Sequence, residues 1–324
     1  MLQPLIHNAE LQKALLLLIP AAAWIFLFLN RTSSIREYSG SFLAYVWQMQ
    51  ASLLLNIVFL AKEFWQFESP NNLFYGVPLD FLIGQGIALG AVNFLVLKKY
   101  GFWLQLVVAI IFLRFIYGQS SIIIIRPSWW MGIAAFSVFS IAPSLLLAKW
   151  TANDTHIYLR SIMQSLSWAC LLLWFFPSSV FQHTHYSWEP FLYRPIWFNA
   201  LYAIPLILPA GILFSALQQF AKEGKGTAFP YDPPKTLVTK GVYAYLSNPM
   251  QLGICLIMAW WGVVIECSLV SLSAVIAVFL FIVFKDICNG SCAIGETDPN
   301  WAVYQKEVPK WIPRKTPWKP TCPS

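Results

Sequence analysis

Runs of apolar residues follow one another along the chain and constrain what it can fold into. A run of about 20 apolar residues, wound as an α-helix, is long enough to cross the hydrocarbon core of a bilayer. We find such runs at residues 12–29, 41–61, 74–97, 102–124, 128–148, 161–177, 197–219, 249–265 and 268–287. They predict an all-α fold, a polytopic bundle of transmembrane helices with about nine spans.

The composition agrees with this prediction and excludes other classes of protein. Hydrophobic residues make up 58% of the 324 residues and charged residues 11%. In soluble domains roughly 45–50% of residues are apolar and roughly 25% are charged. So little charge cannot cover a surface that faces water, which excludes a soluble globular enzyme, a disordered protein and a coiled coil. The six Cys residues are scattered and do not form the framework of a disulfide-rich scaffold.

The Lys and Arg residues fall unequally on the two sides of the predicted spans. One set of alternate loops, together with the C-terminal tail, holds 15 of them, and the opposite loops hold 4. Because cytoplasmic loops collect Lys and Arg, the C-terminus and the loop at 220–248 are predicted to be cytoplasmic. With nine spans the N-terminus lies outside, and the first run is read as a retained helix. The net charge of +7 is then explained by the membrane, and we expect no nucleic-acid partner.

Polar residues that could take part in binding or catalysis concentrate in the last third of the chain, in the loop from Glu223 to Gly253. Glycines permit tight turns there and prolines stiffen the chain. Asn248 is placed to cap a helix that begins with Pro249. The N–H groups at such a helix start favour a carboxylate or a phosphate, although an ordinary loop and helix cap is an equal alternative.

Three sequence blocks carry a family resemblance. The central block is Leu237-Val238-Thr239-x-Gly241-x-Tyr243-x-Tyr245-x-x-Asn248-Pro249-Met250-x-x-Gly253, preceded by Gly226-Thr227-x-x-Pro230-x-x-Pro233-Pro234 and followed by Trp301-x-x-Tyr304-x-x-x-Val308-x-x-Trp311-x-Pro313-Arg314. In this order they resemble the integral-membrane methyltransferases, namely the isoprenylcysteine carboxyl methyltransferases and the phospholipid N-methyltransferases. The resemblance covers about residues 197–320, which defines a methyltransferase-like domain at 197–324 and an N-terminal bundle of unknown role at 1–196.

The resemblance implies a cofactor, S-adenosylmethionine, in a pocket formed by the cytoplasmic loop and the C-terminal segment. Carried over by position, the cofactor-binding residues are Gly241, Val242, Tyr243, Leu246, Asn248, Pro249, Met250, Glu296, Trp301 and Tyr304. The implied acceptor is lipid-like or hydrophobic and carries a carboxylate, an amine or a thiol. Four positions depart from the family pattern, which has Arg, Tyr and paired glutamates where this chain has Ser247, Gln251, Asn289 and Gly290. No catalytic residue is assigned.

Other polar residues have structural and functional interpretations. Asp80 and Arg114 lie within apolar runs, and we predict that they form a structural ion pair. With Gln251 they are also candidates for the acceptor side of the site. His183 and His185 in one loop, and Cys288 and Cys292 at a spacing of four, are weak metal or redox patterns, and no metal site is predicted.

Two alternatives to methyl transfer stay open. The C-terminal hairpin with its Asn-Pro motif is also similar to the steroid 5α-reductase group, which uses NADPH, but the chain continues with Met250-Gln251 in place of Asn-Tyr. The other alternative is a membrane scaffold without catalytic activity. Besides membrane lipids, a membrane-protein partner for the N-terminal bundle is an open prediction.

Overall fold

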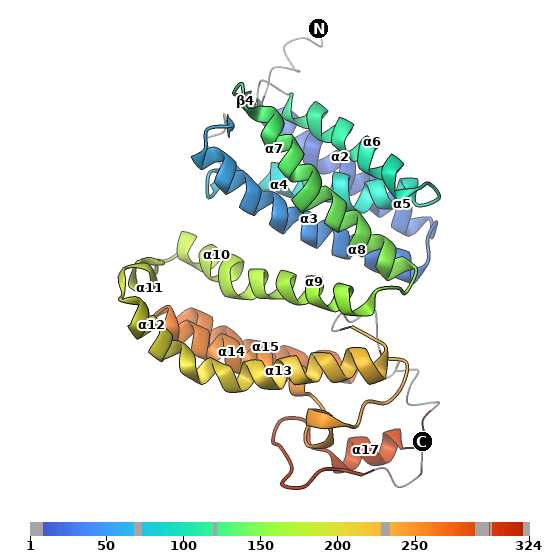
Figure 1. Ribbon diagram of the computed structural model, residues 1–324, viewed down its shortest axis with the longest axis vertical. Helices are drawn as coiled ribbons and strands as arrows, with labels where there is room; N and C mark the ends of the chain where they lie inside the picture. The colour runs from blue at the N-terminus through green and yellow to red at the C-terminus, as the bar shows by residue number, and fades with distance from the viewer. Residues whose placement is uncertain are drawn as a thin grey trace. The chain divides into compact units, whose positions relative to one another are not determined.

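The computed structural model describes residues 9–67, 73–118, 122–227, 234–288, 298 and 300–319, without the side chains of 9, 10 and 281–288. The chain divides into two compact units, Met1–His156 and Ile157–Ser324. Both units are built almost entirely of helices, which are drawn in chain order in Figure 1.

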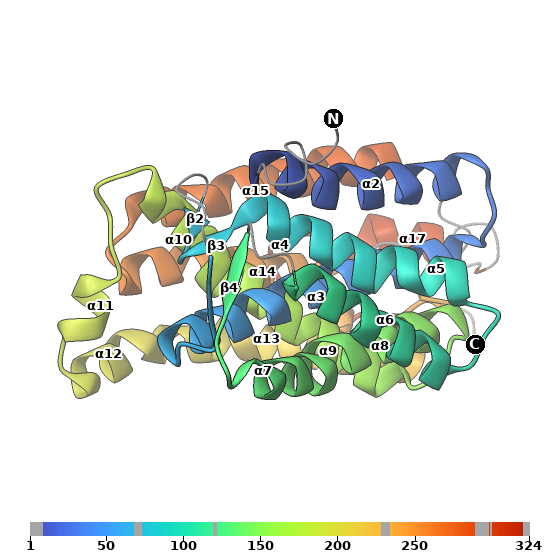
Figure 2. The same ribbon diagram turned by 90° about the horizontal axis from the view of Figure 1, so that it is seen from above.

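The first unit contains seven α-helices in its described part. They are α2 (Ala9–Leu29), α3 (Ile35–Ala61), α4 (Leu79–Gly86), α5 (Asn93–Leu97), α6 (Phe102–Tyr117), α7 (Trp129–Phe136) and α8 (Ala142–Ala152). Helix α3 begins with the capping box that its sequence encodes, because Ser34 Oγ accepts from the Glu37 N–H and the Glu37 carboxylate accepts from the Ser34 N–H. π-Helical segments at Ile87–Val92 and Ser137–Ile141 join α4 to α5 and α7 to α8. Figure 2 shows these helices lying roughly parallel in one bundle.

Short strands interrupt this unit, which the all-α prediction did not include. β1 (Trp65–Phe67) pairs with β4 (Ile123–Ile125), and β2 (Leu73–Phe74) pairs with β3 (Val77–Pro78), both antiparallel. The predicted run at 74–97 therefore begins with a strand pair, and the run at 102–124 ends in a strand. The three consecutive β-branched residues of β4 suit an extended conformation, but inside an apolar run they could not be distinguished from helix.

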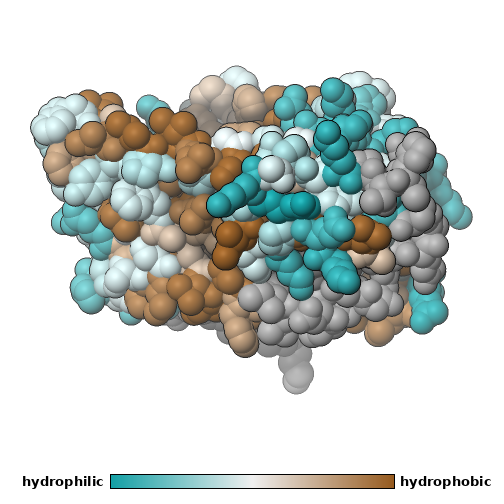
Figure 3. Space-filling view, turned by 90° about the horizontal axis from the view of Figure 1, so that it is seen from below, coloured by the Kyte–Doolittle hydropathy of each residue, from teal (hydrophilic) through white to brown (hydrophobic). Residues whose placement is uncertain are grey.

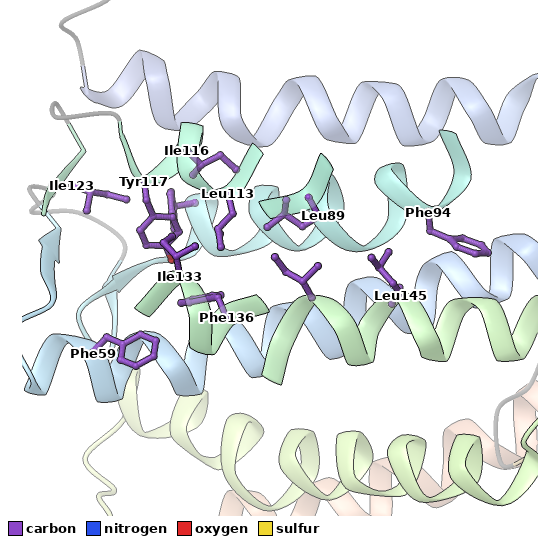
Figure 4. Packing of buried hydrophobic residues seen from close by; sticks show 14 of the residues in the cluster. Phe59, Leu89, Phe94, Leu113, Ile116, Tyr117, Ile123, Ile133, Phe136 and Leu145 are labelled. Carbon is purple, nitrogen blue, oxygen red and sulfur yellow. The ribbon is translucent and has the colours of Figure 1, made fainter. Parts of the chain in front are cut away.

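The core of the first unit is aromatic and aliphatic. Phe59, Tyr117 and Phe136 lie between the helices, where Figure 4 shows them with several aliphatic neighbours. The Trp65 ring is completely buried among them, 4.7 Å from the Tyr117 ring in an edge-to-face contact. Gly40 lets α3 approach α8 closely, since a Cβ there would lie 2.6 Å from the carbonyl oxygen of Ala148.

The second unit carries the region in which the site was predicted. Its α-helices are α9 (Ile157–Cys170), α10 (Phe176–Gln182), α11 (Glu189–Tyr193), α12 (Ile196–Ala203), α13 (Ile207–Gln219), α14 (Pro249–Val264), α15 (Ser268–Cys288) and α17 (Trp301–Glu307). π-Helical segments at Leu171–Phe175 and Phe220–Gly224 follow α9 and α13, and 3₁₀ turns lie at Ile204–Leu206 and Gly241–Ala244. Helix α14 packs against both α13 and α15.

Six helices in the described part of the chain are long and apolar enough to cross a membrane, namely Leu11–Leu29, Ile35–Ala61, Leu79–Leu97, Trp129–Ala152, Ile157–Gln182 and Ile196–Gly224. Three shorter apolar helices, Phe102–Tyr117, Pro249–Val264 and Ser268–Leu280, fall within the remaining predicted runs. Many large apolar side chains on these helices are exposed, and hydrophobic areas occupy much of the face in Figure 3. The fold is that of a helical membrane protein whose described part holds six long candidate spans, and the expected number of nine is not confirmed.

Candidate cofactor pocket

Hydrogen bonds join the two described parts of the loop after α13, residues 224–227 and 234–240, to each other and to the end of α13. The backbone N–H of Lys235 donates to the carbonyl of Gly224 at 2.6 Å, and Thr236 Oγ1 donates to the carbonyl of Glu223 at 2.6 Å. The Lys240 ammonium lies 3.4 Å from the Glu223 carboxylate. The described residues on both sides of 228–233 are therefore tied to one another.

At Gly241, among the described loop residues, the backbone favours a glycine. Its φ is +59°, a left-handed conformation that other residues adopt only with strain. A Cβ at this position would also lie 3.0 Å from Gln219 Cγ at the end of α13. Gly241 therefore allows the chain to turn tightly against α13 just before Tyr243.

The C-terminal segment is fastened to this loop by a series of hydrogen bonds. The Tyr304 hydroxyl donates to the Tyr243 carbonyl at 2.8 Å. Three backbone bonds continue the contact, from Ser247 N to Pro309 O at 2.9 Å, from Arg314 N to Tyr245 O at 3.0 Å and from Trp318 N to Ala244 O at 2.8 Å. The central and C-terminal sequence blocks, separated by the α14–α15 hairpin, thus lie against each other.

A cavity opens where these segments meet. It is a partly open hollow, whose volume of about 490 Å³ includes solvent outside the protein surface. The described residues that line it come from the end of α13, the loop and α17: Phe220, Pro234, Leu237, Val238, Tyr243, Ser247, Trp301, Tyr304 and Gln305. Three of the predicted cofactor residues, Tyr243, Trp301 and Tyr304, are therefore brought together at one pocket.

The electrostatics of this pocket are those of neutral groups. Burial raises the pKa of Tyr243 well above its ordinary value, and the neighbouring Tyr304 adds to the rise. Burial likewise raises the pKa of Tyr304. Both phenols are therefore neutral at physiological pH and keep their protons for hydrogen bonding.

The other predicted cofactor residues are not among the described residues that line the pocket. Gly241 begins the 3₁₀ turn, and Val242 and Met250 pack against the apolar cluster of Ala216, Val238 and Tyr243. Leu246 is buried, as are Asn248 and Pro249 at the start of α14. Glu296 lies outside the described residues, and so do Asn289, Gly290 and Cys292.

The prediction that the Asn248 side chain caps α14 is wrong. Helix α14 begins at Pro249 as expected, but the Asn248 side chain makes no capping hydrogen bond. Its backbone carbonyl instead accepts from the Leu252 N–H at 3.1 Å. The backbone at Asn248, with φ of −124° and ψ of 50°, is not the extended conformation usual for a capping residue.

The predicted ion pair between Asp80 and Arg114 is not formed, although both side chains are described. Asp80 is in the first turn of α4 and accepts from the Phe81 N–H at 2.9 Å. Arg114 is in the last turn of α6, with its guanidinium 4.5 Å from the centre of the Trp129 ring. The Asp80 carboxylate thus lies at the N-terminal end of α4 and the Arg114 guanidinium at the C-terminal end of α6, the ends at which the helix dipole stabilises a negative and a positive charge. Gln251, the third acceptor-side candidate, has a buried Oε1 without a hydrogen-bond partner.

Several lining residues were not predicted as site residues. Pro234, Leu237 and Val238 lie within the sequence blocks, and their place in those blocks was a usable signal. Phe220 directly follows the predicted run at 197–219, and Gln305 is an unspecified position of the C-terminal block, so neither was marked as a site residue by the sequence. His185 stacks on the Tyr186 ring at 4.4 Å, and the described residues contain no group of three His, Cys, Asp or Glu that could hold a metal ion.

Comparisons with protein-family models, curated proteins and solved structures find no match for this chain.

Proposed function

We propose that this protein is a membrane methyltransferase that uses S-adenosylmethionine to methylate a lipid-like or small hydrophobic acceptor at the cytoplasmic face. The observation that carries the proposal is the junction of the central and C-terminal blocks, which resemble those of membrane methyltransferases, at one pocket. Tyr243 contributes from the first block, and Trp301 and Tyr304 contribute from the second. The hydrogen bond from Tyr304 to the Tyr243 carbonyl joins the two blocks directly.

The residues of the pocket fit a cofactor that combines a flat aromatic base with polar groups. The aromatic side chains of Phe220, Tyr243 and Trp301 offer stacking surface, and Ser247 and Gln305 offer hydrogen-bonding groups. The unpartnered Gln251 Oε1, in the first turn of α14, is an additional acceptor. These residues would hold the cofactor, whose sulfonium supplies a methyl group that is already activated.

Methyl transfer from a sulfonium requires mainly that the protein align the nucleophile, the methyl group and the sulfur, and that it exclude water. The buried rings of Tyr243 and Tyr304 exclude water from one wall of the pocket. Their neutral phenols do not act as general bases at physiological pH, which favours an acceptor that is already ionised, such as a carboxylate. The exposed apolar surfaces of the surrounding helices give a lipid-like acceptor access from the bilayer.

Calorimetric titration of the detergent-purified protein with S-adenosylmethionine, and separately with NADPH, tests the proposal. We expect saturable binding of S-adenosylmethionine that is weakened at least tenfold in Tyr243→Ala. Tyr245→Ala is the matched control, because the neighbouring Tyr245 is exposed and contacts the C-terminal segment through its backbone carbonyl. Binding of NADPH alone would favour a reductase. Binding of neither by a folded sample would favour a membrane scaffold.

A further inference from the structure

The C-terminal segment forms a short loop that is bonded at both ends to the turn before α14. At one end the Pro309 carbonyl accepts from the Ser247 N–H at 2.9 Å. At the other end the Arg314 N–H donates to the Tyr245 carbonyl at 3.0 Å. Residues 310–315, which we call the basic tip, are therefore held in a defined place by backbone groups, and their side chains are left for other contacts.

The basic tip exposes apolar side chains. Ile312 is 76% exposed, the neighbouring Trp311 is only half-buried, and Pro313 is exposed. A single exposed apolar residue is ordinary on a protein surface. Apolar and aromatic residues placed next to Lys and Arg are instead typical of segments that lie in the interfacial region of a bilayer.

The cations of the basic tip have no acidic partner among the described residues. Lys310 and Lys315 are exposed and Arg314 is half-buried, and none of the three forms an ion pair in the described part of the chain. Arg314 Nη1 is buried without a hydrogen-bond partner. The carboxylate of Glu307, on the same segment, accepts from the Trp318 indole N–H at 2.8 Å. The charge of the tip therefore favours an anionic partner.

The attachment of the basic tip indicates its depth relative to the membrane. Ser247, to which the segment is bonded, lies two residues before Pro249, the first residue of α14. Helix α14 has 16 residues, about 24 Å, and is shorter than a hydrocarbon core of about 30 Å. Because α14 is predicted to cross the membrane, the turn before it lies at the level of the lipid headgroups on the cytoplasmic side. The basic tip is bonded to that turn and lies at the same level.

We propose that the basic tip docks on the cytoplasmic leaflet and binds its anionic phospholipids. Trp311 and Ile312 lie among the lipid headgroups, and Lys310, Arg314 and Lys315 contact the phosphate and carboxylate groups. The cytoplasmic leaflet has a negative surface potential that attracts Lys and Arg, and aromatic side chains favour the same interfacial zone. Because the same segment lines the pocket through α17, docking attaches the pocket to the membrane surface. This inference goes beyond the proposed function, since it requires neither a cofactor nor an acceptor.

A fluorescent label on the basic tip tests the docking in the full chain. In a background with all six Cys replaced by Ala, Ile312→Cys carries the environment-sensitive dye NBD. The protein is placed in nanodiscs of phosphatidylcholine alone, or of phosphatidylcholine mixed with phosphatidylserine. With phosphatidylserine we expect emission at a shorter wavelength and roughly twofold brighter, because the anionic surface draws the tip and its dye out of water. High salt should reduce the difference, since it screens the attraction.

Charge variants assign the response to the basic tip. Each Lys near an anionic surface contributes roughly a fivefold factor to binding, so Lys310→Gln together with Lys315→Gln should remove most of the difference between the two nanodiscs. Lys306→Gln together with Lys319→Gln is the matched control, because it removes the same charge from the same segment outside the tip. All four side chains are exposed, so these changes leave the fold intact. The control should retain most of the difference.

Three outcomes would overturn the inference. Emission like that in water in both nanodiscs would show that the tip does not dock on lipid, and a protein partner would then be the better occupant. Equal shifts in both nanodiscs would overturn the selection of anionic lipid. An equal loss in the two double variants would show that the response depends on the total charge and not on the tip. None of these measurements contains S-adenosylmethionine, so their result is independent of the proposed function.

Discussion

One buried hydroxyl group, alongside three backbone hydrogen bonds, joins the two parts of the candidate pocket. The Tyr304 side chain is buried, and its hydroxyl donates to the Tyr243 carbonyl at 2.8 Å. Tyr304→Phe keeps the ring and removes this bond, which should cost about 1 kcal/mol of local stability because the carbonyl loses its buried donor. Hydrogen–deuterium exchange in residues 300–319 should become faster. Tyr245→Phe, at an exposed ring on the same turn, should leave the exchange rate unchanged.

The raised pKa of Tyr304 makes the attachment of the C-terminal segment sensitive to alkaline pH. In the folded protein burial holds the pKa above that of the unfolded chain, which is about 10. The folded state therefore binds the phenolic proton more tightly, and this stabilising contribution is complete below pH 10 and lost as the pH rises through the folded-state pKa. Exchange in residues 300–319, corrected for the intrinsic rate, should be constant from pH 7 to 9 and increase above about pH 10. An unchanged profile above pH 10 would contradict this account.

At the scale of elements, the apolar helices were predictable from the sequence, whereas the π-helical segments within them were not. Helix α14 begins at Pro249, where the Asn-Pro motif placed it, whereas the short helix α17 at Trp301–Glu307 was not predicted. The π-helical segment Phe220–Gly224 was not predicted, because the one extra residue in a π-helical turn has no sequence signature that distinguishes it from an α-helix. That segment supplies Phe220 to the pocket. Phe220 was therefore missed as a site residue for the same reason that the π-helical turn was missed.

Helix α3 carries a ladder of buried polar side chains, Gln48, Ser52 and Asn56, at intervals of four residues. Asn56 Oδ1 accepts from the Trp65 indole N–H at 2.9 Å and from the Tyr117 hydroxyl at 3.1 Å. Asn56→Leu leaves the indole N–H without its acceptor, whereas the Tyr117 hydroxyl can still donate to Gln85 Oε1. We expect a loss of about 1–3 kcal/mol, visible as a lower midpoint of thermal unfolding in detergent. Gln66→Leu, at an exposed position on β1, is the control.

At the scale of the whole molecule, the sequence specifies a membrane protein more firmly than it specifies a topology. Helix α14 has 16 residues, about 24 Å, which is shorter than a hydrocarbon core of about 30 Å. The contacts of the turn between α14 and α15 nevertheless indicate on which side of the membrane α14 ends. Arg194, in the loop between α11 and α12, pairs with Glu266 and donates to the Val264 carbonyl at 3.1 Å. The tip of the α14–α15 hairpin therefore lies beside the loop that the charge distribution assigns to the outside.

This arrangement predicts that α14 and α15 cross the membrane although their apolar stretches are short. In a background with all six Cys replaced by Ala, single Cys residues are introduced as Glu266→Cys, His185→Cys, Lys235→Cys and Lys315→Cys. A membrane-impermeant maleimide added outside sealed vesicles of known orientation should label positions 266 and 185, and only permeabilisation should expose positions 235 and 315. Labelling of position 266 together with position 315 would make the hairpin re-entrant and contradict the predicted crossing. Labelling of position 235 from the outside would invert the orientation derived from the Lys and Arg residues and move the pocket away from the cytoplasm.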